Sequence, residues 1–502
     1  MEDIRKNECD DALSEDKKSF SLPTAYELRE KLSRLEGTDA RKNLLAFFDS
    51  ATFSEIGVYT ARHFAEYDIG ADSTVPEGVI CGYGAVDGRL VYAFAQDIAR
   101  DNAAMDERHA KKILSLYKLA SENGAPIVGF FNSFGADIHS GVASLAAYGH
   151  IMRAVAEASG KIPQIAVITG DCTGCAAPIA AMFDFQIVVR DAQYHVHPLE
   201  HDGDKEENAG IAAFDECDVA SAIRNTRILL SYLPSNASEG PVTAPSTDDT
   251  NRTLGKLSFE DDLCHVIAAI ADNGIFEEIS KHFAPDIFTG FCALGGVRCG
   301  IVGNRLLGVT STVDDKHDKE KNKGRFGDAE ARKAARFVSF CDAFSIPVIT
   351  LVDSLGLAFC SEQTEFPYAS SIATLAFAYA SATTPRITVI LGKAIGSAYT
   401  ILGSKAIGAD VVYALDTAEI GPLSTDASVA LTWNDQITED LSRDELEARW
   451  RVCRSSAVAA AYYGEVDDII TVDELRKKIL SAVYMLSAKN QKIEKRHSVF
   501  PL

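Results

Sequence analysis

The sequence of 502 residues is 47% apolar and 24% charged, which is typical of a soluble globular protein and long enough for two domains. Its 49 Lys and Arg against 72 Asp and Glu give a net charge of −23, which argues against a nucleic-acid partner because such binding depends on clustered cations. No apolar run of membrane-spanning length is found, a secretory signal is not expected from the polar, acidic first residues, and the 11 scattered cysteines suit a reducing cytoplasm.

The first predicted element after a polar tail over 1–22 is a β-hairpin over 79–95, with Asp-Gly at its turn. A second hairpin, with Gly-Gly at the turn, is predicted over 287–303. Each hairpin is followed by an amphipathic helix and then by a buried strand, PIVGFF or PVITLV, that leads into a Gly-containing turn. Alternating strands and helices predict an α/β fold.

The last predicted unit of each copy is a strand, a turn rich in small residues and a helix, PQIAVITGDCTGCAAPIAAM and PRITVILGKAIGSAYTIL. Equivalent prolines keep a near-constant spacing of 221, 222 and 224 residues, at Pro126 and Pro347, Pro163 and Pro385, and Pro198 and Pro422. This spacing predicts an internal duplication. We therefore expect one domain over 23–234, a polar linker over 235–255 and a second domain over 256–502.

The two turns rich in small residues are the predicted functional sites. A turn of Gly, Ala and Ser between a strand and a helix points backbone N–H groups outward without covering side chains, which favours binding of an anion. Neither turn has the ending of a P-loop or the GxGxxG spacing of a dinucleotide fold. The plainer alternative is a closely packed junction, and a redox or zinc role for Cys172 and Cys175 is the weakest reading because no second CxxC is present.

With these residues in view, the sequence resembles the carboxyltransferase subunits of biotin-dependent acyl-CoA carboxylases, especially the β subunit of propionyl-CoA carboxylase. The decarboxylases of glutaconyl-CoA and methylmalonyl-CoA share the pattern. The likeness covers about 25 to 490 and is best in VDGRLVYAFAQD (from Val86), GVASLAAYGHIMRAVAEASGKIPQIAVITGDCTGCAA (from Gly141), ARKAARFVSFCDAFSIPVITLVD (from Ala331) and 380–422. It implies two tandem crotonase-like domains, each a ββα superhelix.

The resemblance also implies the reaction and its partners. Carboxybiotin on a carrier protein releases CO2 in the site, the biotin anion takes the α-proton of an acyl-CoA, and the enolate attacks CO2. Coenzyme A enters only as the thioester substrate, and no metal is expected. Implied partners are a biotin carboxyl carrier protein, a biotin carboxylase or a decarboxylase pump subunit, and further copies of the chain. A hexamer built from dimers is implied, with each site shared by two subunits.

Site residues follow from the resemblance position by position. Backbone N–H groups of Gly174 and Cys175 are expected to bind the thioester oxygen, and those of Ser397 and Ala398 the ureido oxygen of biotin. Substrate contacts are expected from the residues that flank these four in the sequence, Thr173, Ala176, Gly396, Tyr399 and Thr400, and from Gly135 and Ala136.

The chain departs from the family pattern near these turns. The common Gly-Gly pairs are Gly174-Cys175 and Gly396-Ser397 here, and the common DSGGAR reads NSFGAD over 132–137. The segment over 354–374 also differs. These departures keep a non-catalytic paralogous subunit as an alternative. A decarboxylase α subunit is a further alternative, because in such complexes the partner subunits set the direction of carboxyl transfer. A crotonase-type hydratase ranks last, because it requires a carboxylate at the first turn and Asp171 is the only acid in GDCTGCAAP.

Two further groups of polar residues are interpreted as solvent-exposed loops. His195 and His197 with Glu200 and His201 have a spacing compatible with a metal site, but a polar loop is preferred. The mixed-charge run over 314–328 is read as a solvated loop, with contact of its lysines and Arg325 to CoA phosphates as the alternative.

Overall fold

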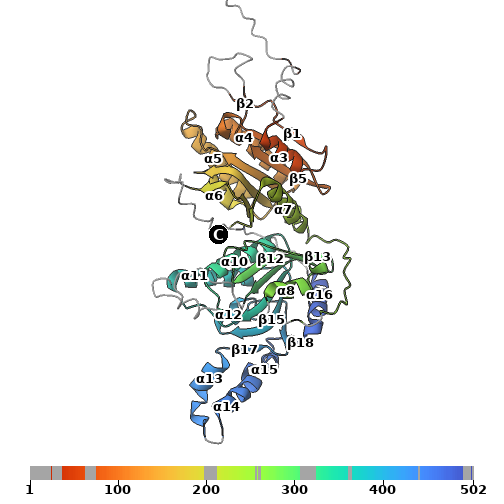
Figure 1. Cartoon of the computed structure of the whole chain (residues 1–502), viewed down its shortest axis with the longest axis vertical. Coiled ribbons are helices and arrows are strands. Elements are labelled where there is room, and N and C mark those ends of the chain that lie inside the picture. Colours follow the sequence, from red (N-terminus) through yellow and green to blue (C-terminus); the bar gives the residue numbers. More distant parts are fainter. Residues whose placement is uncertain are drawn as a thin grey trace, which may run out of the picture.

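The computed structural model describes residues 37–62, 75–196, 212–254, 262–305, 324–359, 365–438 and 441–489, together with residues 24, 26, 257 and 499. Two sheets, one in each half of the chain, lie one above the other along the long axis (Figure 1). The tail predicted over 1–22 lies outside the described residues.

The first half has one large mixed sheet with helices against it, and a separate short antiparallel pair of strands, β2 (Ala61–Arg62) and β3 (Val75–Pro76). In the large sheet the first two strand pairings are antiparallel, and the later ones are parallel. The strands follow the order β1 (Ser54–Ile56), β4 (Val79–Val86), β5 (Arg89–Gln96), β6 (Ile127–Ser133), β7 (Gln164–Thr173), β8 (Phe185–Val189) and β10 (Phe214–Glu216), with β9 (Gln193–His195) paired to β7. The helices are α3 (Asp39–Phe47), α4 (Glu107–Asn123), α5 (Val142–Ala158), α6 (Ala176–Met182) and α7 (Val219–Tyr232).

The second half repeats this sheet strand for strand, which confirms the predicted duplication and the α/β class. Its order is β11 (Phe276–Glu278), β12 (Ile287–Leu294), β13 (Val297–Asn304), β14 (Val348–Ser354), β15 (Arg386–Ile395), β16 (Val411–Leu415) and β18 (Asp468–Ile470), with β17 (Glu419–Gly421) paired to β15. The helices are α8 (Leu263–Ile270), α10 (Asp328–Ala343), α11 (Glu365–Ser381), α12 (Ser397–Ile401), α13 (Thr425–Thr432), α14 (Arg443–Trp450), α15 (Ala457–Tyr462) and α16 (Leu475–Leu486).

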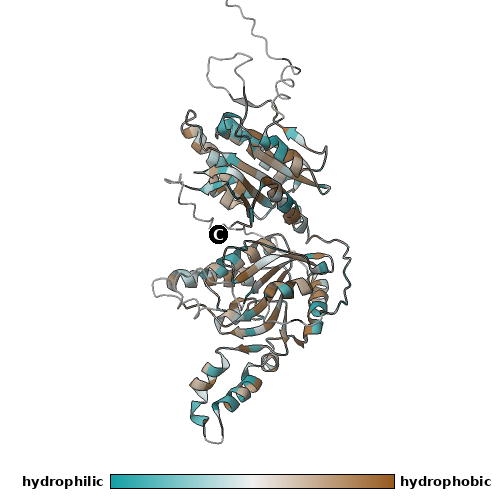
Figure 2. Cartoon of the chain, viewed as in Figure 1, coloured by the Kyte–Doolittle hydropathy of each residue, from teal (hydrophilic) through white to brown (hydrophobic). Residues whose placement is uncertain are grey.

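Local sequence explains why these elements form. Both hairpins have the predicted two-residue turns between β4 and β5 and between β12 and β13. Asp106 caps the start of α4, and Gly124 ends it with a φ of 59°, a left-handed conformation that favours glycine. The predicted apolar stripe of α10 is buried, and Figure 2 shows apolar residues concentrated in the strands of both sheets. No helix in the described ranges is long and apolar enough to cross a bilayer.

The two hairpin turns are held by equivalent aspartates that the sequence did not single out. In the first half, Asp49 accepts the N–H of Gly88 at 2.9 Å and pairs with Arg227 of α7 at 2.8 Å. Arg227 also donates to the carbonyl of Phe47, the last residue of α3, at 2.7 Å. One arginine therefore ties the end of a helix to a hairpin turn.

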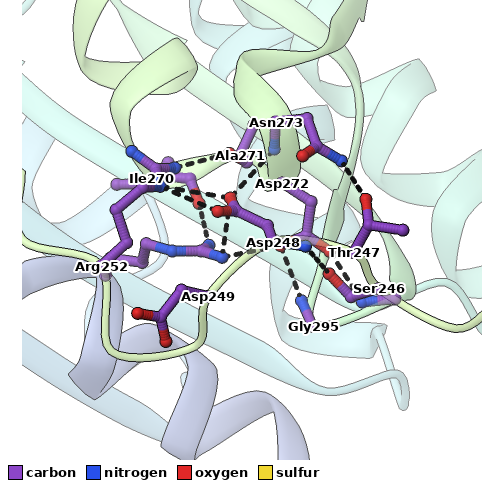
Figure 3. Close-up of polar contacts among 12 residues, drawn as sticks. Ser246, Thr247, Asp248, Asp249, Arg252, Ile270, Ala271, Asp272, Asn273 and Gly295 are labelled. Carbon is purple, nitrogen blue, oxygen red and sulfur yellow. Dashed lines mark hydrogen bonds and ion pairs between the residues drawn. The ribbon is translucent and has the colours of Figure 1, made fainter.

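In the second half the same arrangement is buried (Figure 3). Asp272 accepts the N–H groups of Gly295 and Gly296 at 3.0 and 2.8 Å and pairs with Arg476 of α16 at 2.9 Å. Arg476, only 1% exposed, donates to the carbonyl of Ile270 at 2.6 Å. Burial opposes ionisation of Asp272, but the two N–H groups and the guanidinium outweigh it and lower the pKa of this carboxyl.

The described part of the predicted linker is bound along its length. Ala237 N donates to the Lys161 carbonyl of the first half at 2.9 Å, and Arg298 N of β13 donates to the Val242 carbonyl at 2.9 Å. Asp248 joins the ion pairs of Figure 3 by accepting from Arg476 at 3.1 Å. The segment therefore joins the halves through fixed contacts.

The two halves share an apolar interface. The ring of Phe185 in β8 meets those of Phe340 in α10 and Phe291 in β12, with centroids 4.6 and 6.1 Å apart. Arg336 of α10 donates to the carbonyl of Asp184 at 2.7 Å across this interface. Burial raises the pKa of the Asp184 carboxyl to about 7, against the opposing effects of the Gln164 N–H and the Arg336 charge.

We expect Asp184 to make folding less favourable as pH rises. Because its folded pKa lies above the unfolded value, its stabilising effect is complete below about pH 4 and is lost as pH rises through 7. Asp184→Asn should remove this dependence, so the stability of the variant relative to wild type should increase by roughly 2–3 kcal/mol between pH 5 and 8.5. Urea unfolding at both pH values measures it, and a constant difference would contradict the expectation.

A helical extension beyond the second sheet was not predicted. Helices α13, α14 and α15 project away from the sheet at the end opposite the first half (Figure 1). The rings of Trp433 and Trp450 meet edge to face, with centroids 4.7 Å apart, and hold α13 against α14. Leu446 is the one buried residue of α14. Helix α14 therefore adds surface rather than core, whereas α15 places Ala457 in the core.

Candidate active site

The first predicted turn lies at the carboxyl end of β7, where the chain passes into α6. Gly174 has a φ of 60°, which favours glycine, and Cys175 has a φ of −68° and precedes the helix. Both residues are exposed, and a Cβ on Gly174 would have no atom within 4 Å. Among the described residues, no hydrogen bond engages the N–H groups of Gly174 and Cys175. Two adjacent donors are therefore available to a ligand.

Strand pairing brings Gly135 and Ala136 beside this turn. Ser133 at the end of β6 pairs with Cys172 in β7, so the loop after Ser133 starts next to the turn. Met105 N donates to the Gly135 carbonyl at 2.8 Å and holds the loop in place. Thr173 is the last residue of β7 and is half-buried, and Ala176 is the first residue of α6 and is buried.

The second predicted turn follows β15. Gly396 has a φ of 62°, and its N–H donates to the Gly421 carbonyl of β17 at 2.8 Å. Ser397 and Ala398 are the first residues of α12, and within the described ranges their N–H groups engage no hydrogen bond. Tyr399 donates its hydroxyl to Glu465 at 3.3 Å, and Thr400 is exposed.

The two turns occupy equivalent positions in the duplication, but they differ in which backbone N–H groups lack a partner among the described residues. Gly174 and Gly396 are 222 residues apart in the duplication. The N–H of Gly396 is bound by β17, whereas that of Gly174 is free among the described residues. The free donors of the second turn therefore begin one position later, at Ser397.

The redox, metal-site and CoA-phosphate interpretations receive little support from the described residues. Burial raises the pKa of the Cys172 thiol to about 12, so it is a poor nucleophile and a poor metal ligand. In the described ranges no three His, Cys, Asp or Glu side chains are grouped as metal ligands, and His197, Glu200 and His201 lie outside them. The guanidinium carbon of Arg325 lies 4.4 Å from the centroid of the Phe359 ring. Most of the run over 314–328, for which contact with CoA phosphates was the alternative, lies outside the described residues.

Sequence reasoning missed an exposed apolar patch next to the first turn. It consists of side chains in the loop after β6 and in the first turn of α5, which are 56–90% exposed: Phe134, Ile138, Val142 and Leu145. Apolar patches of this kind mark surfaces that bind another molecule. In the sequence, FGADIHSGVASL carries apolar residues within a Gly-rich loop, which was the available signal.

Comparison with known proteins places this geometry in a family. The model of the carboxyl transferase domain matches residues 38–197 and 204–500. The carboxyltransferase subunit of propionyl-CoA carboxylase from Haloferax mediterranei is 33% identical over 92% of this chain and 93% of its own. The methylmalonyl-CoA decarboxylase α subunit from Veillonella parvula is 32% identical over the same shares.

A solved structure agrees. The transcarboxylase 12S structure with methylmalonyl-CoA and methylmalonic acid bound, described as a hexamer, is 30% identical over 95% of both chains, with a TM-score of 0.81. The comparisons confirm the predicted pair of crotonase-like domains and the predicted enzyme class. The chain therefore belongs to the carboxyl transferase family, in its propionyl-CoA and methylmalonyl-CoA type.

Proposed function

We propose that this chain moves a carboxyl group between biotin on a carrier protein and the α-carbon of a short acyl-CoA, acetyl-, propionyl- or similar. The observation that carries the proposal is the pair of duplicated turns, each with two adjacent backbone donors that no described residue engages. Such donors stabilise an oxygen that becomes negative in the transition state, without a side-chain base.

Each turn has its own role in this proposal. Gly174 and Cys175 would bind the thioester oxygen and stabilise the enolate, while Ser397 and Ala398 would bind the ureido oxygen of biotin, which supplies the carboxyl group. A Cβ at Gly174 would meet no atom within 4 Å, so the backbone of this turn is not covered on that side. The neighbours expected to contact substrate are Thr173, Ala176, Gly135, Ala136, Gly396, Tyr399 and Thr400.

The tyrosine of the second turn has a defined position. Its hydroxyl is held by the hydrogen bond to Glu465, and the residue directly follows Ala398 in the chain. The exposed thiol of Cys175 narrows the first turn relative to a Gly-Gly pair. We therefore infer a preference for short acyl chains.

We further propose that the chain works as a homo-oligomer, a hexamer built from dimers, in which the first turn of one subunit faces the second turn of another. The apolar patch formed by Phe134, Ile138, Val142 and Leu145 supports an additional subunit contact at the first turn. The exposed apolar residues of the helical extension, among them Leu431, Val452 and Tyr462, also support subunit contacts.

The remaining partners are a biotin carboxyl carrier protein and either a biotin carboxylase or a decarboxylase pump subunit, in the cytoplasm. The likeness to the Veillonella parvula decarboxylase subunit favours the α subunit of an acyl-CoA decarboxylase as the second candidate. The same two turns serve both directions of carboxyl transfer. The boundaries over 23–234 and 256–502 are part of this proposal.

A direct assay tests the function. Purified protein is mixed with free biotin and with malonyl-, methylmalonyl- or glutaconyl-CoA, and the release of CO2 is measured. We expect biotin-dependent release from at least one of the three. A correctly assembled oligomer that gives no biotin-dependent release with any of them would favour a non-catalytic paralogous subunit.

A further inference from the structure

A polar side chain lies directly behind the first turn. Asn132 of β6 accepts the N–H of Asp171, three residues before Gly174, at 3.1 Å through its Oδ1. Its carboxamide packs on Gly170, where a Cβ would lie 2.2 Å from Oδ1. Its own N–H donates to Oε1 of Gln96 in β5 at 3.1 Å. Asn132 therefore links three neighbouring strands just before the turn.

The second half has the same arrangement with a different side chain. Asp353 of β14 accepts the N–H of Lys393 at 2.6 Å, three residues before Gly396. Its carboxyl packs on Gly392, where a Cβ would lie 2.4 Å from Oδ1. The Asp353 N–H donates to Oδ1 of Asn304 in β13 at 2.8 Å, and the Asn304 amide donates back to the Asp353 carbonyl.

Both residues lie at irregularities in the sheets. The regular pairing of β6 with β7 shifts between Phe131 and Ser133, and that of β14 with β15 shifts between Val352 and Ser354. A bulge turns a side chain in a direction that a regular strand would not allow. Asn132 and Asp353 occupy these positions, and each binds the next strand instead of a sheet partner.

We propose that Asn132 and Asp353 are the positioning residues of the two turns, and that the carboxyl of Asp353 makes the second turn alone sensitive to protonation. This inference rests on the proposed function of the turns. Neither residue is placed in contact with substrate. Each fixes the strand end from which two N–H donors project, and donors must be held in place to stabilise a transition state.

The environment of the Asp353 carboxyl supports a sensitivity to protonation in the second turn and not in the first. Burial raises the pKa of Asp353 to about 6, while the N–H and the charge of Lys393 in β15 act in the opposite direction. Asn304, packed against it from β13, is neutral. Lys393 is the one charged group that interacts with this carboxyl among the described residues. Asn132 has no proton to gain in this range.

Isosteric exchanges and truncations at both positions test the inference. Asp353→Ala should weaken use of free biotin at least tenfold in kcat/KM, with the KM for acyl-CoA nearly unchanged. Asn132→Ala should lower kcat/KM for the acyl-CoA at least tenfold and should leave the KM for free biotin nearly unchanged. Asp353→Asn carries a neutral isostere of the protonated carboxyl, so its kcat/KM for biotin should lose the decline that wild type shows between pH 7 and 5. Asn132→Asp is the matched exchange. Its kcat/KM for the acyl-CoA should decline between pH 7 and 5, as that of wild type does for biotin.

Amide hydrogen exchange gives a readout that needs no activity. Asp353→Ala should speed exchange in 393–398 and not in 171–176, whereas Asn132→Ala should show the opposite pattern, and each isosteric variant should resemble wild type. Unchanged exchange in both Ala variants, or a pH profile of Asp353→Asn identical to that of wild type, would overturn the inference. An inactive wild type with these exchange patterns would instead count against the proposed function alone.

Discussion

Cys175→Pro is expected to lower the rate of carboxyl transfer by about a hundredfold or more while the protein still folds. The φ of Cys175, −68°, already matches the angle that proline imposes, and the residue is exposed, so this position itself can accept the ring. What the substitution removes is one backbone N–H. Loss of one such donor costs about 3 kcal/mol of transition-state stabilisation.

The matched variants isolate this effect. Cys175→Gly keeps the N–H and restores the pair common in the family, so its rate should stay near that of wild type. Ser397→Pro, at the first residue of α12 where proline is tolerated, should give a loss of similar size in the second turn. Initial rates are compared for proteins of equal oligomeric state. A Cys175→Pro oligomer that transfers carboxyl groups at the wild-type rate would show that the first turn is wrongly assigned.

The sequence predicted the repeated elements well because each depends on local chemistry. The Asp-Gly and Gly-Gly turns specify their hairpins, and the spacing of Ala334, Phe337, Val338 and Cys341 specifies the buried face of α10. The strand-to-turn-to-helix units that contain Gly174 and Gly396 are also local. Two such units at a fixed offset predicted two equivalent halves.

Contacts between distant segments could not be predicted in this way. Asp49 and Arg227 are 178 residues apart, and Asp272 and Arg476 are 204 apart. Nothing in either local sequence identifies the partner. The same limit applies to the N–H of Gly396, because only the packing of β17 beside β15 determines that Gly421 engages it.

Arg476→Met is expected to lower the free energy of unfolding by about 3–5 kcal/mol, because it leaves the carboxylates of Asp272 and Asp248 buried without their shared cation. It also leaves the carbonyl of Ile270, at the end of α8, without a donor. The matched control is Arg227→Met in the first half. Its loss should be smaller, because Arg227 is 25% and Asp49 is 29% exposed and water replaces the guanidinium there.

Two further measurements separate the charge from the packing. Because the pKa of Asp272 is lowered in the folded protein, the ion pair stabilises the fold above about pH 4, and this stabilisation is lost as pH falls through the folded pKa. The deficit of Arg476→Met in urea unfolding should therefore be largest near pH 7 and shrink in acid. Adding Asp272→Asn should restore part of the loss at pH 7, since the unpaired carboxylate is then gone. A deficit that is the same at pH 7 and at a pH well below 4 would mean that Arg476 acts through packing alone, and the duplicated ion pair would then be incidental to stability.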